Sequence, residues 1–159
     1  MTRSMLITAV IGASMLSACT SVPVTTSPDD SQWRLRNFLD NGLAQTVRVY
    51  NFCYNGKESD FVAARDFAPG EHTVVTKVTQ TFNNIESKPK EAYATLKGDF
   101  EAGNTYVFQK DIEENQATLW IADVETGKAV SEQVEVTLAI GEVVDNEQRQ
   151  RRRCMASTL

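Results

Sequence analysis

Histidine is the scarcest chemically versatile residue in this chain, which contains only one, His72. A Ser-His-Asp or Cys-His nucleophilic site would have to use that residue. A zinc site needs three or four His and Cys ligands, and the chain has few of either. His72 follows a Pro-Gly pair and begins an expected strand. A histidine there commonly hydrogen-bonds the turn, so we expect a structural role for it. The sequence predicts no metal and no other cofactor.

Two sequence signatures of catalysis are also missing, namely a glycine-rich phosphate loop and a Gly-x-Ser-x-Gly nucleophile motif. Carboxylates gather at Asp111, Glu113 and Glu114 and again at Asp123 and Glu125. Both groups fall at expected strand ends or turns, where solvated carboxylates are usual, although weak calcium binding there is conceivable. We therefore expect a protein that is not an enzyme. The alternative is an enzyme that uses these carboxylates, or an inhibitor of another enzyme.

The chain has no apolar run of the roughly 20 residues that a membrane-spanning helix needs. Its apolar stretch is the shorter segment 5–16, which follows Arg3 and leads into Leu16-Ser17-Ala18-Cys19. Together these features resemble the signal peptide and lipobox of bacterial lipoproteins. The resemblance implies that residues 1–18 are removed and that Cys19 receives a diacylglyceryl thioether and an N-acyl chain such as palmitate. An ordinary signal peptide with an incidental cysteine is the alternative.

The residues after Cys19 bear on the location of the protein. Thr20 stands where Asp, in the Gram-negative family, resembles an inner-membrane retention signal, so the resemblance favours the outer membrane and a body facing the periplasm. In a Gram-positive host the lipid would hold the protein on its only membrane. Residues 19–31 are rich in Ser, Thr, Pro and Asp and predict an extended tether. The membrane is thus the first expected partner, through the lipid on Cys19.

Charge is distributed unevenly along the chain. Residues 19–148 hold 11 basic and 21 acidic side chains, a net charge of −10. This acidic body argues against nucleic-acid binding. Arg149, Arg151, Arg152 and Arg153 reverse the sign in a basic C-terminal tail, residues 146–159. Segment 142–153 could be a short charged helix or a disordered tail, and because the arginines have no apolar stripe beside them we favour disorder or a loosely docked helix. The tail could grip an anionic partner, or it could be a solvated segment that pairs with the acidic body.

The sequence has three cysteines, Cys19, Cys53 and Cys154. If Cys19 carries lipid, the other two remain, and an even pair in an oxidising compartment favours a disulfide. A Cys53–Cys154 bridge would close a loop of roughly a hundred residues and stabilise the fold by up to about 4.7 kcal/mol in the chain-entropy model. A mobile tail around Cys154 would leave both thiols free, so both states stay open.

Alternating apolar and polar residues predict strands through most of the body, residues 32–145. We expect about seven, at 46–53, 57–64, 72–79, 92–100, 105–110, 117–124 and 134–140. Asn55-Gly56 is a strong hairpin signal between the first two. The polar segment 80–90 is expected to be the longest loop, and segment 29–40 a short helix or irregular lead-in. The fold class is therefore all-β, an antiparallel β-sandwich.

Particular side chains are expected to fill the core of that sandwich. Ala94, Leu96, Phe100, Tyr106 and Phe108 fall on the inward faces of two consecutive strands.

The two tryptophans are less uniform. Trp120 lies between Leu119 and Ile121 and is expected in the core, whereas the place of Trp33 is less certain. Either could be an exposed anchor for a protein or a sugar.

Three segments carry a second resemblance. Segments 67–74, 100–108 and 120–123 place a Pro-Gly turn, a Glu-Ala-Gly turn and a hydrophobic strand ending in Asp in succession. This succession resembles PEGA-type and related small β-sandwich domains of bacterial lipoproteins. The resemblance implies a transthyretin-like or immunoglobulin-like sandwich and implies no reaction and no catalytic residues.

These features together predict a membrane-anchored envelope lipoprotein that binds or scaffolds other components. An envelope protein is the expected partner, met by strand edges and by the loop at 80–90.

Overall fold

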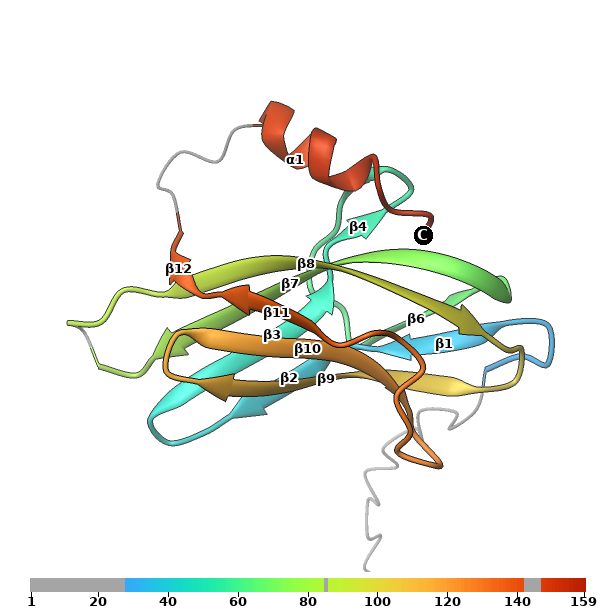
Figure 1. Ribbon diagram of the computed structural model, residues 1–159, viewed down its shortest axis with the longest axis horizontal. Coiled ribbons are helices and arrows are strands. Elements are labelled where there is room, and N and C mark those ends of the chain that lie inside the picture. Colours follow the sequence, from blue (N-terminus) through green and yellow to red (C-terminus); the bar gives the residue numbers. More distant parts are fainter. Residues whose placement is uncertain (1–27, 85, 142–146) are drawn as a thin grey trace, which may run out of the picture.

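The computed structural model describes residues 28–84, 86–141 and 147–159. The segment expected to be a signal peptide, Cys19 and most of the expected tether therefore lie outside the described residues. The described chain is built from strands, with one short helix at its C-terminal side (Figure 1). Within the described ranges, no helix is long and apolar enough to cross a membrane.

Two five-stranded sheets pack face to face and confirm the expected all-β sandwich. The first sheet has the strand order β11 (Val134–Thr137), β10 (Gln116–Asp123), β9 (Thr105–Glu113), β1 (Trp33–Arg36) and β6 (Ala64–Phe67). The second sheet has the order β12 (Ala139–Ile140), β8 (Lys90–Phe100), β7 (Gly70–Phe82), β3 (Gln45–Asn51) and β2 (Phe38–Asn41). A small hairpin of β4 (Cys53–Tyr54) and β5 (Lys57–Glu58) and the helix α1 (Glu147–Cys154) lie beside the second sheet.

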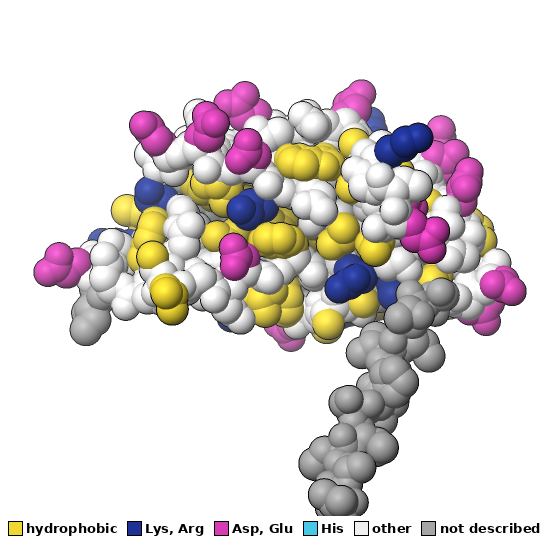
Figure 2. Space-filling model, turned by 90° about the horizontal axis from the view of Figure 1, so that it is seen from below, with side chains coloured by type: hydrophobic (Ala, Val, Ile, Leu, Met, Phe, Trp, Pro, Cys, Tyr) yellow, Lys and Arg dark blue, Asp and Glu magenta, His cyan; other side chains and the backbone are white. Residues whose placement is uncertain are grey.

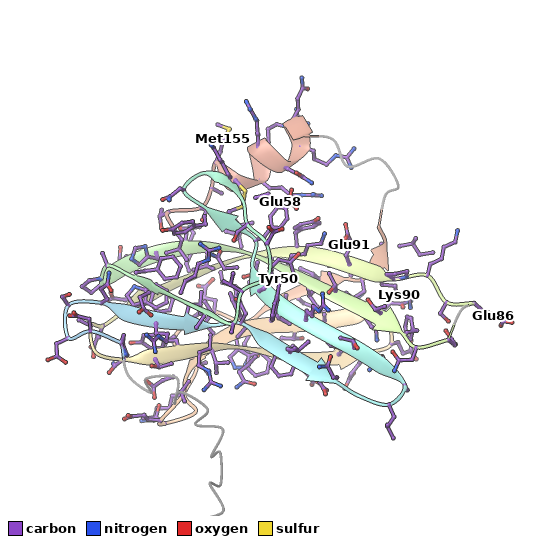
Figure 3. The ribbon with its side chains drawn as sticks, turned by 180° about the vertical axis from the view of Figure 1, so that it is seen from behind. Tyr50, Glu58, Glu86, Lys90, Glu91 and Met155 are labelled. Carbon is purple, nitrogen blue, oxygen red and sulfur yellow. A yellow bond between two sulfur atoms is a disulfide. The ribbon has the colours of Figure 1, made fainter. Side chains whose placement is uncertain are left out.

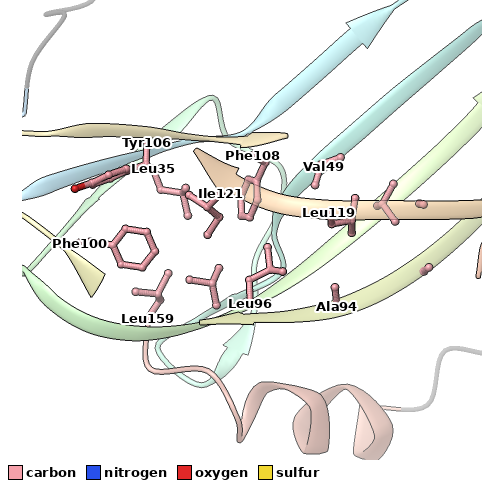
Figure 4. Packing of buried hydrophobic residues seen from close by; sticks show 14 of the residues in the cluster. Leu35, Val49, Ala94, Leu96, Phe100, Tyr106, Phe108, Leu119, Ile121 and Leu159 are labelled. Carbon is pink, nitrogen blue, oxygen red and sulfur yellow. The ribbon is translucent and has the colours of Figure 1, made fainter. Parts of the chain in front are cut away.

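The core lies between the two sheets and follows from the period-2 alternation of their strands. All five inward positions expected on β8 and β9 are buried (Ala94, Leu96, Phe100, Tyr106 and Phe108). They pack against Leu119 and Ile121 of β10 and Val49 of β3 (Figure 4). Burying each of the larger side chains among these, such as leucine or phenylalanine, stabilises the fold by roughly 1.5–3 kcal/mol.

The expectation of a short helix or irregular lead-in at 29–40 is wrong, because this segment forms the strands β1 and β2. Trp33 and Leu35 are buried and alternate with Arg34 and Arg36, which is the period of a strand. β1 lies between β6 and β9, antiparallel to the former and parallel to the latter. Its position inside the first sheet makes it an integral strand of the sandwich rather than a lead-in to it.

The turn at Asn55-Gly56 is present, with φ values of 51° and 70°. Both residues adopt the positive φ that a type I′ hairpin turn requires. The expected returning strand begins at Lys57 as predicted but is far shorter than 57–64, since its pairing stops at Glu58 and the chain crosses to the first sheet as β6. The Asn55-Gly56 pair was enough to predict the hairpin, because a turn depends on adjacent residues. The pairing of β6 with β1 depends on residues far apart in the sequence, so no local pattern predicts it.

Two other boundaries differ from expectation. β7 continues to Phe82, and Gln80 pairs with Lys90 of β8, so the loop between these strands covers only 83–89 rather than 80–90. The expected strand at 134–140 is divided between the sheets, because β11 belongs to the first and β12 to the second. Leu138, buried between them, marks the crossing. The described chain has twelve strands rather than the expected seven, because three expected strands are each divided in two and β1 and β2 are additional.

Of the two tryptophans, Trp33, whose place was uncertain, is buried in the core, and the expectation that Trp120 lies in the core is wrong. Trp33 has no exposed surface, stacks on Phe100 with ring centroids 4.1 Å apart, and donates a hydrogen bond from Nε1 to the carbonyl oxygen of Ala68 at 2.7 Å. Trp120 is only partly buried, because Leu119 and Ile121 on either side of it point into the core. Trp120 therefore lies on the outer face of the first sheet.

Candidate interaction surface around the C-terminal helix

A disulfide joins the helix to the hairpin. Cys53 of β4 and Cys154 of α1 are 101 positions apart in the sequence, and their Cα atoms lie 5.3 Å apart across the bond. Both side chains are buried. The bridge that the cysteine count left open is thus formed in the structure, and α1 is fixed to the body at its C-terminal end.

A second, smaller hydrophobic cluster lies beneath α1, on the outer side of the second sheet. It consists of Phe52, Cys53, Val75 and Cys154, with Tyr50 and Tyr93 packed against it. This cluster explains why Val75 is buried although its neighbours Val74 and Thr76 face the core between the sheets. The outer face of β7 is covered here by the hairpin and the helix, so the strand is buried on both sides.

The segment after α1 is also attached to the sandwich. The backbone N–H of Thr158 donates to the carbonyl of Thr73, and the Thr158 hydroxyl accepts from the Thr73 N–H at 2.9 Å. The carbonyl of Leu159 accepts from the N–H of Asn55, and its side chain enters the main core beside Phe100 (Figure 4). Of the alternatives for segment 142–153, the short charged helix is therefore the one that forms, over Glu147–Cys154, whereas the preference for disorder or loose docking is wrong for its described residues. A disulfide and a buried leucine outweigh the lack of an apolar stripe on the helix.

One arginine of α1 packs on the sheet below it. The guanidinium carbon of Arg153 lies 3.7 Å from the ring centroid of Tyr93, which is a cation–π distance. The Tyr93 hydroxyl donates to Glu91, and Glu91 also forms an ion pair with Lys77 at 2.8 Å. Figure 3 shows Glu91 and Tyr50 on this face of the sheet, with α1 above them. Arg153 is thereby joined to a polar network that spans β7 and β8.

Burial and hydrogen bonding shift the titration of this network. Burial opposes the charged form of Lys77, but hydrogen bonds to Glu91 and Tyr93 outweigh it and raise the Lys77 pKa. Burial raises the pKa of the Tyr93 and Tyr50 hydroxyls, with Lys77 opposing the change in both. All three groups therefore hold their protons more tightly in the folded protein than in an unfolded chain.

A hollow of about 760 Å³ lies where α1 meets the β4–β5 hairpin. The hairpin lines it with Lys57 and Glu58, and the helix and the residue after it line it with Gln150, Arg151 and Met155. Met155 is 82% exposed although it is a large apolar side chain. Figure 3 places Glu58 below α1 and Met155 at the end of the helix.

A smaller hollow of about 160 Å³ lies on the other side of the helix, where Arg149 and Arg153 meet Tyr93 and Ile140. We use the name helix surface for Lys57 together with Arg149, Arg151, Arg152, Arg153 and Met155. The remainder of the body is acidic. The face turned away from α1 shows Asp and Glu side chains around its rim, and apolar side chains interspersed with Lys and Arg in its middle (Figure 2).

His72 has the structural place that its sequence context predicts. Its Nε2 lies 2.7 Å from the carbonyl oxygen of Ala68, and its Nδ1 lies 3.2 Å from the Thr158 hydroxyl. The ring packs near Trp33, with centroids 5.6 Å apart. Both ring nitrogens thus engage the turn before β7 and the C-terminal segment.

The acidic clusters do not converge on a common centre. Asp111, Glu113 and Glu114 are exposed along the end of β9 and the turn after it. Asp123 accepts hydrogen bonds from the backbone N–H groups of Thr126 and Glu125 and from the Thr126 hydroxyl, which lower its pKa and fix the turn. Nowhere in the described ranges do three or more His, Cys, Asp or Glu side chains group as metal ligands would.

Sequence reasoning named the arginines and the cysteines but not the surface they form. The segment 147–154 has no apolar stripe, since Cys154 is its one apolar residue. Knowledge of the Cys53–Cys154 pairing would have located the helix beside the hairpin, because the bridge leaves little freedom in its placement. Comparisons of the chain with known protein families, curated proteins and solved structures gave no match.

Proposed function

We propose that the protein is a lipid-anchored, non-enzymatic binding module of a bacterial cell envelope, and that the helix surface is where it engages another envelope component. The observation that carries the proposal is an arginine-rich helix held by a disulfide on an otherwise acidic body. Guanidinium groups are suited to bidentate contacts with carboxylates and phosphates. A helix held in place loses little conformational freedom on binding, so more of the contact energy contributes to affinity.

The anchor is supported by the sequence at residues 1–31. Cys19 follows an apolar segment and two small residues, and the Ser, Thr, Pro and Asp residues after it suit a tether. Two or three acyl chains on one residue would make release from the membrane very slow, whereas a single chain binds only marginally. The outer membrane, with the body in the periplasm, is the location we propose.

The anchor is tested by changing Cys19→Ser. We expect the variant to carry no acyl chain and to accumulate as an uncleaved precursor, measured by mass spectrometry of the membrane fraction and by gel mobility. Normal acylation of the variant would contradict the proposed anchor.

The binding role is tested by crosslinking inside the cell. A photoreactive amino acid at Arg152 on α1 is expected to give a specific adduct with an envelope protein. The same group at Glu125, an exposed turn residue of the first sheet, is the matched control and should not give that adduct. Equal adducts from both positions, or none from Arg152, would contradict the binding role.

A further inference from the structure

We infer that the hollow between the β4–β5 hairpin and α1 binds an acidic, extended segment of a protein partner. This inference deepens the proposed function, on which it rests for the location of the partner, by assigning the partner's chemistry. The hollow, about 760 Å³ in volume, is open to solvent on the surface of the molecule and lies at the disulfide-linked junction of hairpin and helix.

Charge is the first argument for an acidic segment. Lys57 reaches the hollow from the hairpin and Arg151 from the helix, so cationic groups line two opposite sides of it. Arg152 is exposed beside them on α1. Glu58 is the one carboxylate among the lining residues, so the lining keeps a net positive charge while most of the body is negative. Carboxylates of a partner would be attracted here and repelled by the rest of the body.

The shape of the hollow favours a polypeptide segment over a lipid surface. A flat bilayer contacts protruding groups, and helices that bind bilayers expose a broad apolar face. On α1 the one apolar side chain, Cys154, is buried in the disulfide, and Met155 alone among the residues lining the hollow is a large, well-exposed hydrophobe. A chain of amino acids can enter a concavity, place carboxylates against Lys57 and Arg151, and set one apolar side chain against the flexible Met155.

The orientation of the molecule agrees with this occupant. The described chain begins next to β1 of the first sheet, whereas α1 covers the outer side of the second sheet (Figure 1). With the anchor at the N-terminal side, the hollow lies across the sandwich from the strand to which the tether leads. A partner that reaches the hollow from the periplasm is thus better placed than the membrane that holds the tether.

The test uses the full, disulfide-bonded protein in detergent and two probes. The first probe is a fluorescent 12-residue peptide rich in Asp and Glu, and its Asn/Gln counterpart reports on charge. The second is a vesicle of about 70% phosphatidylethanolamine and 30% phosphatidylglycerol, used after the detergent is removed. Because the proposed acyl chains on Cys19 would hold every variant on the vesicle, its readout is the difference in binding between variants. We expect the acidic peptide to bind, and its binding to weaken as salt rises. The triple variant Lys57→Gln, Arg151→Gln, Arg152→Gln should raise the Kd about tenfold or more, which corresponds to about 1.4 kcal/mol.

The matched control removes the same number of charges elsewhere. Lys88→Gln, Lys97→Gln and Lys128→Gln change three exposed lysines outside the helix surface, and this variant should change the Kd less than twofold. Equal weakening by both triple variants would show attraction by overall charge and overturn the inference. No binding to the peptide, together with vesicle binding that the helix-surface variant weakens and the control variant does not, would overturn it in favour of a lipid partner.

The two proposals fail in different ways. Peptide binding that depends on the helix surface upholds the inference even if crosslinking at Arg152 in cells yields no envelope protein, a result that would count against the proposed function. A specific crosslinked protein without acidic-peptide binding upholds the function and overturns the inferred chemistry.

Discussion

At the scale of single residues, the two tryptophans show what decides burial in a sandwich. Trp120 has the more apolar neighbours in the sequence, Leu119 and Ile121, yet the alternation of a strand sends it to the other face. Trp33 stands between Gln32 and Arg34, yet it shares the inward face of β1 with Leu35. Whether a residue in a strand is buried therefore depends less on apolar neighbours in the sequence than on which of the two alternating faces its side chain occupies.

Substitution of the tryptophans separates these two places. Trp33→Phe removes the hydrogen bond from Nε1 to Ala68 and leaves unfilled volume beside Phe100, so we expect a loss of roughly 1–3 kcal/mol in the free energy of unfolding. Trp120→Phe, on the outer face, should cost less than about 1 kcal/mol. Urea unfolding followed by circular dichroism measures both. A loss at Trp120 as large as that at Trp33 would contradict the burial described here.

At the scale of elements, the polar network under α1 is expected to make the stability of the fold decrease at alkaline pH. Lys77, Tyr50 and Tyr93 all have pKa values raised by folding. A group whose pKa is raised in the folded state binds its proton more tightly there than in the unfolded state. Its stabilising contribution is complete below the unfolded pKa and is lost as pH rises through the folded pKa.

We expect the free energy of unfolding to fall as pH rises above about 10, where unfolded tyrosine and lysine side chains begin to release protons. Unfolding in urea at pH 9, 10 and 11 measures this dependence. Tyr93→Phe removes one of the three groups and should make the fall shallower, although its packing under Arg153 is kept. A slope unchanged by Tyr93→Phe would show that the network does not couple stability to pH.

The strands were predictable where one face alternates cleanly, and the connections were not. β8, β9 and β10 appear within a few residues of their expected positions, because their inward side chains repeat every second residue. The crossings after Glu58 and at Leu138 carry no local signal of that kind. They depend on which sheet has room for the next strand, a property of the assembled sandwich.

At the scale of the whole molecule, the C-terminal segment closes the structure in two places. The Cys53–Cys154 bridge fastens α1 over the small cluster at Phe52, and Leu159 fills a position in the main core. The two attachments lie on opposite sides of the second sheet. Removing either is expected to destabilise the body, but for different reasons.

Cys53→Ala with Cys154→Ala should lower the free energy of unfolding by about 2–5 kcal/mol, mainly because the unfolded chain regains the freedom of a long loop. Leu159→Ala should lower it by about 2–3 kcal/mol through lost burial. Urea unfolding measures both, with a reductant as the control. Reductant should destabilise the unaltered protein and Leu159→Ala but leave the double variant unchanged. A loss below about 1 kcal/mol in the double variant would contradict a stabilising bridge.

The candidate site was predictable only in its parts. The cysteine count allowed the pairing of Cys53 with Cys154, and the charge reversal at residues 149–153 singled out the arginines. Their arrangement required the hairpin, the helix and the outer face of β8 to meet, as at the contact of Arg153 with Tyr93. Residues far apart in the sequence create that surface, so composition and spacing name its members without locating them.

The placement of β1 between β6 and β9 has a mechanical consequence. A pull carried along the segment before residue 33 reaches β1 first, and β1 is hydrogen-bonded to a neighbour on each side. Before β1 can detach, its backbone hydrogen bonds to β6 and to β9 must break, and Trp33 must separate from Phe100. In the proposed arrangement, with a tether before β1 and a partner bound at α1, the strand that first takes up the tension is thus hydrogen-bonded on both sides, and the tension would reach the core before it separates the sheets.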